Sequence, residues 1–489
     1  MKQRVVGKRQ RTGVWNMGVT ERLARFAVET PREAIPHTVF DAAKLRYLDT
    51  IGVMVAGSRH PATLIALDLA RHLGGNTRAS IVGHADRTST DLAGYVNGTA
   101  AHALEYDDYT RMVTHLNVSM VPGTLALAED LGLSGKLMLE ANIIGFQVAA
   151  QVAKGLRPWL FDRGWHPNGI FGAIGVAVAG ARMMRLDTLQ TRMAIGIAAS
   201  EASGLRKNVG SMGKPFHVGH GIRCGIFAAL LAARGYQVDP DIIEGVADGI
   251  EGHDRFGMAD TFNGVGNYDL AKMEEGIEED AGIIWTLGEN TTVVRFHPGA
   301  TGQASAIDGM IDLATEHNLK ATDVERIELE CTTQVMSIGS YREAHDGHKA
   351  RFCLTYGMAV ALLDRKAGLE QYTDERVRRA DVQSLMQRVD VRVPDDFRHH
   401  HGQWGDGVNW GEMRLTVHTK DGRRLAVSRS HARGWPEQPA TWNDVAEKFT
   451  ECCRGVLSAA QTSRAIELIA KLDSVELREL IDALRPAAA

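Results

Sequence analysis

The sequence lacks the cysteine patterns of metal clusters and disulfide frameworks, and it lacks the positive charge of a nucleic-acid surface. Its 489 residues include five cysteines, none spaced as C-x-x-C or in a zinc-binding pattern. Reduced thiols in a cytoplasmic protein are therefore expected. The formal net charge of -5 gives no basic surplus for nucleic acid. An anionic substrate would need locally placed cations instead.

Membrane spans and nucleotide-binding glycine motifs are also missing. No apolar run approaches the ~20 residues of a membrane span, so we expect no membrane partner. Residues 1–16 are basic but lack the apolar stretch of a secretory signal. We expect the natural start near Met17, with a disordered segment before it. No GxGxxG follows a predicted strand, and no GxSxG occurs, which excludes a Rossmann site and a hydrolase elbow.

Helical periodicity dominates residues 17–290. Apolar residues recur there at i, i+3, i+4 and i+7, as in amphipathic helices. Alanine and glycine are frequent on the apolar faces, and aromatic residues make up only 6% of the chain. We therefore expect a large all-α domain whose core is filled by small side chains in closely packed helices.

A smaller domain is predicted for residues 291–430. Alternating apolar and polar residues indicate strands, and Asp421-Gly422 is a strong hairpin signal. The expected strands span residues 324–333, 389–393, 412–419 and 423–430, and a helix spans 352–364. This predicts an α+β unit with an antiparallel sheet. Helical periodicity returns in residues 431–489, which we expect to pack on the first domain, so that the fold is mostly α.

Polar residues gather between His102 and His115, at the end of a predicted helix. Glu105, Asp108 and Tyr109 stand at i, i+3 and i+4, which predicts that they share one helical face. Acidic groups beside a histidine hold the imidazole by hydrogen bonds and raise pKa values. This arrangement is one way to make a base at neutral pH. The alternative interpretation is a solvated helix end.

Two further segments place basic side chains at predicted helix starts. Pro167 and Pro215 suit a first helical turn, which puts His166 just before one helix and Lys214 at the start of another. Free N–H groups at such a start attract a carboxylate. Lysine there would have a lowered pKa or bind an anion. The alternative is that both are ordinary helix starts.

The triplet of histidines at residues 399–401 is metal-like in composition only. His399, His400 and His401 are contiguous, without the spacing that converges on an ion. We therefore expect no metal site there.

Several motifs, taken together, resemble the MmgE/PrpD family. They are LDTIGVMVAG, NGTAAHALEYDD, Thr114-His115, Trp165-His166-Pro167 and GLRKNVGSMGKPFHVGHGIRCGIFAALLAARG. The resemblance covers residues 19–485, and the last motif is specific. The family includes 2-methylcitrate dehydratase, cis-aconitate decarboxylase and iminodisuccinate epimerase. The resemblance implies a helical domain capped by an α+β lid, a site between them, a homodimer, and no metal or organic cofactor.

The resemblance also implies which residues form the site. His115, His166 and Lys214 fall on family active-site positions. Glu105 replaces an aspartate and Tyr109 a threonine of decarboxylase-like members. We expect His115, His166 and Lys214 to be catalytic. The residues expected to contact the substrate are Glu105, Asp108, Tyr109, Arg206, Lys207, His217 and Arg295.

Two positions depart from the family pattern. Val294 stands where the lid normally supplies a lysine, with Arg295 beside it, and Leu116 stands where the decarboxylase has proline. The resemblance as a whole implies a lyase that dehydrates or decarboxylates a small di- or tricarboxylate. The alternatives are an epimerase that moves a proton between two bases, and a non-catalytic member of the family.

Overall fold

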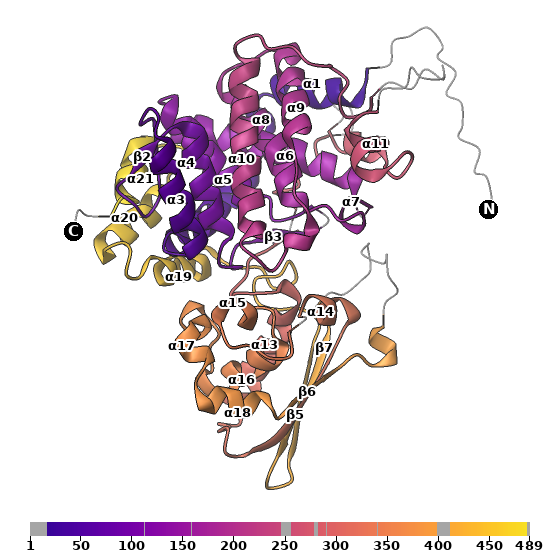
Figure 1. Ribbon diagram of the computed structural model, residues 1–489, viewed down its shortest axis with the longest axis vertical. Helices are drawn as coiled ribbons and strands as arrows, with labels where there is room; N and C mark the ends of the chain where they lie inside the picture. The colour runs from indigo at the N-terminus through magenta and orange to yellow at the C-terminus, as the bar shows by residue number, and fades with distance from the viewer. Residues whose placement is uncertain are drawn as a thin grey trace, which may run out of the picture.

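The protein consists of a helical domain and a smaller lid (Figure 1). The structure is a computed structural model, and it describes residues 17–111, 113–157, 159–245, 256–277, 282–289, 291–339, 341–398 and 411–486. The expectations for residues 1–16 and for the histidines at 399–401 lie outside this part of the chain. Within the described part, no helix is both long enough and apolar enough to cross a membrane.

The helical domain is built from most of the chain before residue 290 and from the last three helices. Its longer helices are α1 (Val19–Glu29), α2 (His37–Gly57), α3 (Pro61–Leu73), α4 (Thr90–His102), α5 (Asn117–Asp130), α6 (Gly135–Leu156), α8 (Pro167–Met183), α9 (Thr188–Glu201) and α10 (Gly213–Ala232). Shorter elements are α7 (Trp159–Asp162), α11 (Met258–Asn263), α12 (Leu270–Glu274), η1 (Arg32–Ala34), η2 (Arg206–Asn208), β1 (Ala79–Ser80) and β2 (Arg87–Thr88).

Small residues let the central helices approach closely. Gly221 of α10 faces Gly169 of α8, where an added Cβ would lie 2.7 Å from the Gly169 carbonyl oxygen. Side chains larger than glycine would force these backbones apart. Three of the segments singled out from the sequence are thereby brought together, because α4 and α8 both pack on α10.

The chain returns to the helical domain after the lid. The last helices are α19 (Trp442–Cys453), α20 (Ala459–Ala470) and α21 (Leu477–Ala483). The first two pack on α2, and Phe449 belongs to the same hydrophobic core as Leu23 of α1. All five cysteines are free and buried.

The lid is an α+β layer with its own hydrophobic core. Its helices are α13 (Ala304–Glu316), α14 (Thr333–Ile338), α15 (Gly347–Ala350), α16 (Leu354–Asp364), α17 (Asp374–Val377) and α18 (Ala380–Met386), with short helices η3 (Thr301–Gln303), η4 (Leu369–Tyr372) and η5 (Asp395–Phe397). Its strands are β5 (Val324–Cys331), β6 (Val389–Arg392), β7 (Met413–Thr419) and β8 (Arg424–Arg429). The helices α13 and α16 pack against the sheet.

The sheet differs from the prediction in one pairing. Its order is β6-β5-β7-β8, and β7 pairs antiparallel with both neighbours. The turn of the β7–β8 hairpin contains Gly422, whose φ of +87° suits glycine. However, β6 runs parallel to β5, so the sheet is mixed. The reason is the long helical connection between these strands, which allows the chain to cross over and re-enter in the same direction.

Candidate active site

The site forms where α4 ends. The helix ends at His102, and Glu105 adopts a φ of +52°, in the left-handed region that a continuing helix excludes. Tyr109 and Thr110 then form β3 (Tyr109–Thr110), which pairs antiparallel with β4 (Thr292–Val293) at the entrance to the lid. The predicted helical face shared by Glu105, Asp108 and Tyr109 is therefore wrong, because the chain leaves the helix before these residues.

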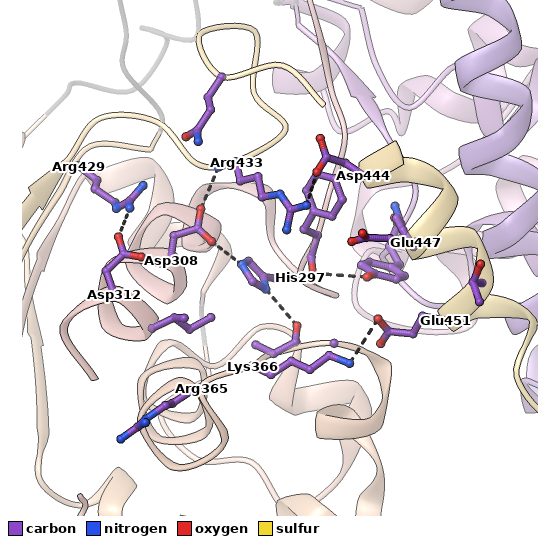
Figure 2. Close-up of a pocket in the computed structure, with 18 of the residues that line it drawn as sticks. His297, Asp308, Asp312, Arg365, Lys366, Arg429, Arg433, Asp444, Glu447 and Glu451 are labelled. Carbon is purple, nitrogen blue, oxygen red and sulfur yellow. Dashed lines mark hydrogen bonds and ion pairs between the residues drawn. The ribbon is translucent and has the colours of Figure 1, made fainter. Parts of the chain in front are cut away.

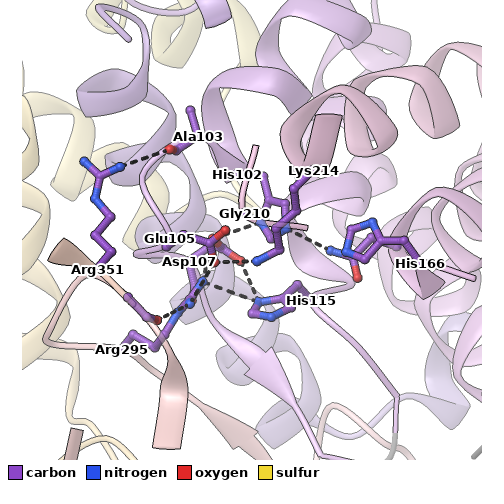
Figure 3. A network of polar contacts seen from close by, with 12 residues as sticks. His102, Ala103, Glu105, Asp107, His115, His166, Gly210, Lys214, Arg295 and Arg351 are labelled. Atoms are coloured by element: carbon purple, nitrogen blue, oxygen red, sulfur yellow. Dashed lines mark hydrogen bonds and ion pairs between the residues drawn. The ribbon is translucent and has the colours of Figure 1, made fainter. Parts of the chain in front are cut away.

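Asp107 lies at the centre of the site. One carboxylate oxygen is 3.0 Å from Nδ1 of His102 and the other is 2.8 Å from Nδ1 of His115. His102 and Asp107 are fully buried. On its far side, Nε2 of His102 accepts a hydrogen bond from the Asn168 amide at 3.2 Å. One carboxylate thus orients two imidazoles (Figure 3).

His115 is poised as a neutral imidazole. Burial lowers its pKa, Asp107 raises it, and the positive charges of Arg295 and Lys214 lower it, so that the pKa falls to about 4. Its Nδ1–H donates to Asp107 and to the carbonyl oxygen of Asp108 at 2.7 Å. These bonds fix the tautomer and leave Nε2 as the acceptor. The geometry suits a proton carrier.

A second pair of histidines meets at the start of α8. His166 is the residue before the helix, as the sequence predicts, and Pro167 is its first residue. Nδ1 of His166 lies 3.0 Å from Nδ1 of His217. Burial and the nearby charge of Lys214 lower the pKa of His166 well below its usual value. His166 faces the cavity described below, whereas His217 lies behind it.

Three buried charges meet beside these imidazoles. Lys214, the second residue of α10, forms an ion pair with Glu105. Nη1 of Arg295 lies 3.4 Å from Glu105, and its Nη2 lies 2.7 Å from Asp107. Burial alone would raise the pKa of Glu105, but Lys214 and Arg295 help to lower it to about 2. The two carboxylates are therefore ionised at neutral pH and hold both cations in place.

These groups surround a cavity of about 160 Å³ between the helical domain and the lid, the His115 cavity. Figure 3 shows His115, His166 and Lys214 converging from different elements. The lid closes it with η3, α14 and Phe352, while Nε2 of His348 contacts the Gly210 carbonyl oxygen at 2.5 Å. The lining residues are Glu105, Tyr109, Thr114, His115, Arg157, Phe161, His166, Pro167, Asn168, Val209, Lys214, Arg295, Ala300, Thr301, Gly302, Gln334, Val335, Ile338 and Phe352.

Six of the ten residues predicted from the sequence line this cavity. They are His115, His166, Lys214, Glu105, Tyr109 and Arg295. The structure places the other four elsewhere, at positions from which they do not reach it: Asp108, Arg206, Lys207 and His217.

His217 contacts His166 from outside the cavity, and the other three residues lie in different surroundings. The Asp108 carboxylate accepts a hydrogen bond from Asn117 at 2.6 Å, and burial raises its pKa to about 7. The Arg206 guanidinium stacks 3.7 Å above the Phe161 ring. Lys207 is exposed on η2. Val294, at the position of the family lysine, is also outside the cavity: it is buried in the core and leaves Arg295 to enter the site.

Four residues of the site were not predicted. Asp107 has the same sequence signal as Asp108, and periodicity selected the wrong one because the segment is not helical. Asn168 directly follows the predicted His166-Pro167 pair. Arg157 and Gln334 carry no local signal, because α6 and α14 reach the cavity only through tertiary packing.

The cluster of His102, Asp107 and His115 was tested as a metal site. Their ligand atoms lie within 4.8 Å of one another, which one ion could bridge. However, Nη2 of Arg295 lies 2.7 Å from the carboxylate and 3.5 Å from Nδ1 of His115. Both imidazole Nδ1 atoms also need their protons to bond Asp107. A fixed guanidinium therefore occupies the place of a cation, and these residues do not fit a metal ion.

A second and larger cavity, the Arg433 cavity, has a volume of about 680 Å³ and lies between the lid and α19 (Figure 2). It is back to back with the first, because Tyr106 and Phe296 line it while their neighbours Glu105 and Arg295 line the His115 cavity. Five of its six lysine and arginine side chains pair with protein carboxylates, as Arg429–Asp312, Arg433–Asp444, Lys366–Glu451, Arg454–Glu370 and Lys448–Asp49. The sixth, Arg365, is exposed and donates to the Asn318 side chain and the Leu319 carbonyl oxygen.

Two family models match the chain. The MmgE/PrpD N-terminal domain matches residues 21–255, and the MmgE/PrpD C-terminal domain matches residues 297–474. The chain is similar to cis-aconitate decarboxylase of Homo sapiens, with 24% identity over 90% of this chain and 88% of the relative. It is also similar to cis-aconitate decarboxylase of Aspergillus terreus, with 23% identity over 93% of each chain.

Proposed function

Because the chain belongs to the MmgE/PrpD family, we propose that it is a lyase that removes carbon dioxide or water from a small tricarboxylate. Relatives named for the decarboxylation of cis-aconitate cover almost the whole chain and support this choice. The observation that carries the proposal is the Asp107–His115 pair, which faces a closed cavity beside Lys214 and Arg295.

His115 moves the proton in this proposal. In a decarboxylation, the bond between the substrate carbon and the departing carboxylate breaks, and the electron pair moves into the remaining unsaturated acid. Protonated His115 then delivers a proton to carbon. In a dehydration, neutral His115 instead takes a proton from a carbon beside a carboxylate, and the hydroxyl leaves as water with a proton from a second group such as His166. An anionic substrate raises the pKa of His115 from its low value in the free protein.

Lys214 stabilises the negative charge that develops on the substrate. Its ammonium group faces the cavity and is held by ionised Glu105, so it needs no rearrangement when charge appears. The lid supplies apolar side chains, among them Val335, Ile338 and Phe352, which limit access of water.

Proton NMR in D₂O with cis-aconitate, citrate and 2-methylcitrate tests the proposal. We expect loss of substrate with formation of a decarboxylated or dehydrated product. His115→Gln should lower the rate by about 10²-fold or more. Deuterium incorporation at carbon with no loss of carbon dioxide or water would indicate the epimerase alternative. A wild-type rate in His115→Gln would contradict the assignment of the base.

We also infer that the protein forms a homodimer through α3 and α10, which flank α4. Several large apolar side chains on these helices are exposed: Leu64, Ile65, Leu69, Leu73, Phe216 and Phe227. Apolar exposure of this kind is typical of an interface. Light scattering should give twice the chain mass, and Ile65→Glu should shift the protein toward monomer. A monomeric wild-type protein would contradict the inference.

A further inference from the structure

Arg157 differs from the other cations of the His115 cavity. Among the described lining residues, the lysine and arginine side chains are Arg157, Lys214 and Arg295. Lys214 pairs with Glu105, and Arg295 pairs with Glu105 and Asp107. In the described part of the chain, no carboxylate oxygen lies within 4.0 Å of the Arg157 guanidinium, whose polar contacts are with neutral oxygens. Within the described residues, one positive charge in the wall of the cavity is thus not paired with a carboxylate.

The guanidinium of Arg157 is held in place from one side only. Arg157 follows the last residue of α6, and its Nη1 donates to the Val113 carbonyl oxygen at 2.6 Å and to the Tyr109 hydroxyl at 3.5 Å. Among the described residues, its Nε and Nη2 have no hydrogen-bond partner. A planar guanidinium offers two parallel N–H donors to one carboxylate. The geometry therefore leaves a site for one carboxylate.

Tyr109 sets the separation between Arg157 and His115. Its hydroxyl contacts Arg157, while its ring lies edge-on to the His115 ring with centroids 5.1 Å apart. The phenol of Tyr109 therefore contacts both the arginine and the histidine. A ligand that reaches both needs a carboxylate separated by a few bonds from the carbon that exchanges a proton.

Gln334 of the lid gives an independent indication that a polar ligand completes the cavity. Its side chain is only 6% exposed and lines the cavity, and its Oε1 has no hydrogen-bond partner among the described residues. Leaving a buried amide unsatisfied costs about 1–3 kcal/mol. A substrate hydroxyl would donate to this oxygen from inside the cavity.

We propose that Arg157, positioned by Val113 and Tyr109, binds the non-reacting carboxylate of the substrate and selects polycarboxylates over acids that lack this group. This inference rests on the proposed function for the identity of the substrate. It assigns a specificity-determining role to a residue that does not take part in proton transfer.

Binding of propane-1,2,3-tricarboxylate, which cannot eliminate water, tests the inference without turnover. Isothermal titration of Arg157→Gln should show a Kd about 10- to 100-fold higher than that of the wild type. Arg157→Lys keeps the charge but loses the fork, and should fall between them. Arg163→Gln is the matched control, because Arg163 lies on the same segment, outside the cavity, and donates to the Phe262 carbonyl oxygen.

The central monoamide and the two enantiomeric terminal monoamides of the same acid identify the carboxylate that Arg157 binds. One monoamide should bind equally to wild type and Arg157→Gln, because the charge lost from the ligand is the partner of the charge lost from the protein. Equal Kd values of the parent acid for wild type and Arg157→Gln, or no binding to the wild type, would overturn the inference. Binding that depends on Arg157, with no turnover of any acid, would instead contradict only the proposed reaction.

Discussion

The two cavities share a wall but treat charge in opposite ways. In the larger Arg433 cavity, Arg433 pairs with Asp444 and Arg429 with Asp312, so protein carboxylates neutralise most of its cations, and the remaining one, Arg365, is exposed to solvent. In the His115 cavity, carboxylates hold Lys214 and Arg295 in place, yet no described residue accepts a hydrogen bond from Nε or Nη2 of Arg157. The difference teaches that volume is a poor guide to function here. The smaller space has the incomplete polar groups that a ligand can complete.

The shared wall explains how neighbouring residues can belong to different environments. Along the turn after α4, Glu105 lines one cavity and Tyr106 the other. Arg295 and Phe296 alternate in the same way, and the Tyr106 hydroxyl donates to the Phe296 carbonyl oxygen at 3.4 Å. Two extended segments therefore separate the proposed site of chemistry from a region held by ion pairs.

Among variants that distinguish the two cavities, Asp107→Asn is expected to cause the largest loss of activity. The two carboxylate oxygens of Asp107 each accept from one imidazole, whereas an amide has only one accepting oxygen. The substitution also removes the buried negative charge that pairs with Arg295. We expect kcat/KM to fall roughly 10⁴-fold, as for other carboxylates that orient a catalytic histidine. Asp108→Asn is the matched control and should lose less than about tenfold, because the carboxyl of Asp108, with a pKa of about 7, is already partly neutral. Equal losses in both variants would contradict the role given to Asp107.

Among the residues that line the Arg433 cavity, Lys448 should have the largest effect on the free energy of unfolding when it is replaced by methionine. Nζ of Lys448 lies 2.6 Å from Asp49 and donates to the Tyr106 carbonyl oxygen at 2.7 Å. Removing it leaves a buried carboxylate unpaired, which costs about 3–5 kcal/mol. Urea unfolding measures this loss. The double variant Lys448→Met/Asp49→Asn should recover part of it, and no recovery would show that the pair is not the cause.

The pH dependence of kcat/KM tests whether His115, which lines the His115 cavity, is the group that titrates. The pKa of His115 in the free protein is lowered to about 4, so the neutral base is present above that pH and is lost as the pH falls through it. For a dehydration, in which neutral His115 is the base, we expect kcat/KM to decrease about tenfold per pH unit below 4. For a decarboxylation, in which protonated His115 is the acid, kcat/KM should instead decrease as the pH rises above 4. Circular dichroism at each pH controls for unfolding. An acidic limb near the ordinary histidine value of 6.5 would show that His115 is not the titrating base.

The smallest effect is expected from Arg433→Ala. Arg433 pairs with Asp444 at the rim of its cavity, and the arginine side chain is 46% exposed. Such pairs contribute about 0–1 kcal/mol to stability. The free energy of unfolding should change by no more than this, and kcat/KM should not change. A large loss of activity would show that the Arg433 cavity takes part in the reaction.

The sequence predicted the scaffold of the site better than its interior. His166 and Lys214 could be placed because proline and helix-start chemistry act over a few residues, and the structure has both at helix starts. Glu105 could not, because its left-handed φ interrupts the periodicity on which its position was predicted. The choice of Asp108 over Asp107 failed for the same reason.

Local sequence patterns could not predict features that depend on contacts between segments far apart in the chain. Arg157 reaches the cavity through the packing of α6 against α8, and the parallel direction of β6 follows from the helices that precede it. Val294 lies in the core and its neighbour Arg295 lines the His115 cavity, because successive side chains of the extended chain after β4 point to opposite sides. Only the three-dimensional arrangement distinguishes the buried valine from the arginine in the site.

The return of the chain to α2 has a consequence during synthesis. The apolar face of α2, which ends at Gly57, packs on α19, which begins at Trp442. At ~5–20 residues per second, the ribosome exposes the first helices for tens of seconds before their last partners emerge. Throughout that interval the nascent helical domain carries an uncovered hydrophobic surface, which makes it a candidate for chaperone binding and sensitive to truncation at its C-terminus.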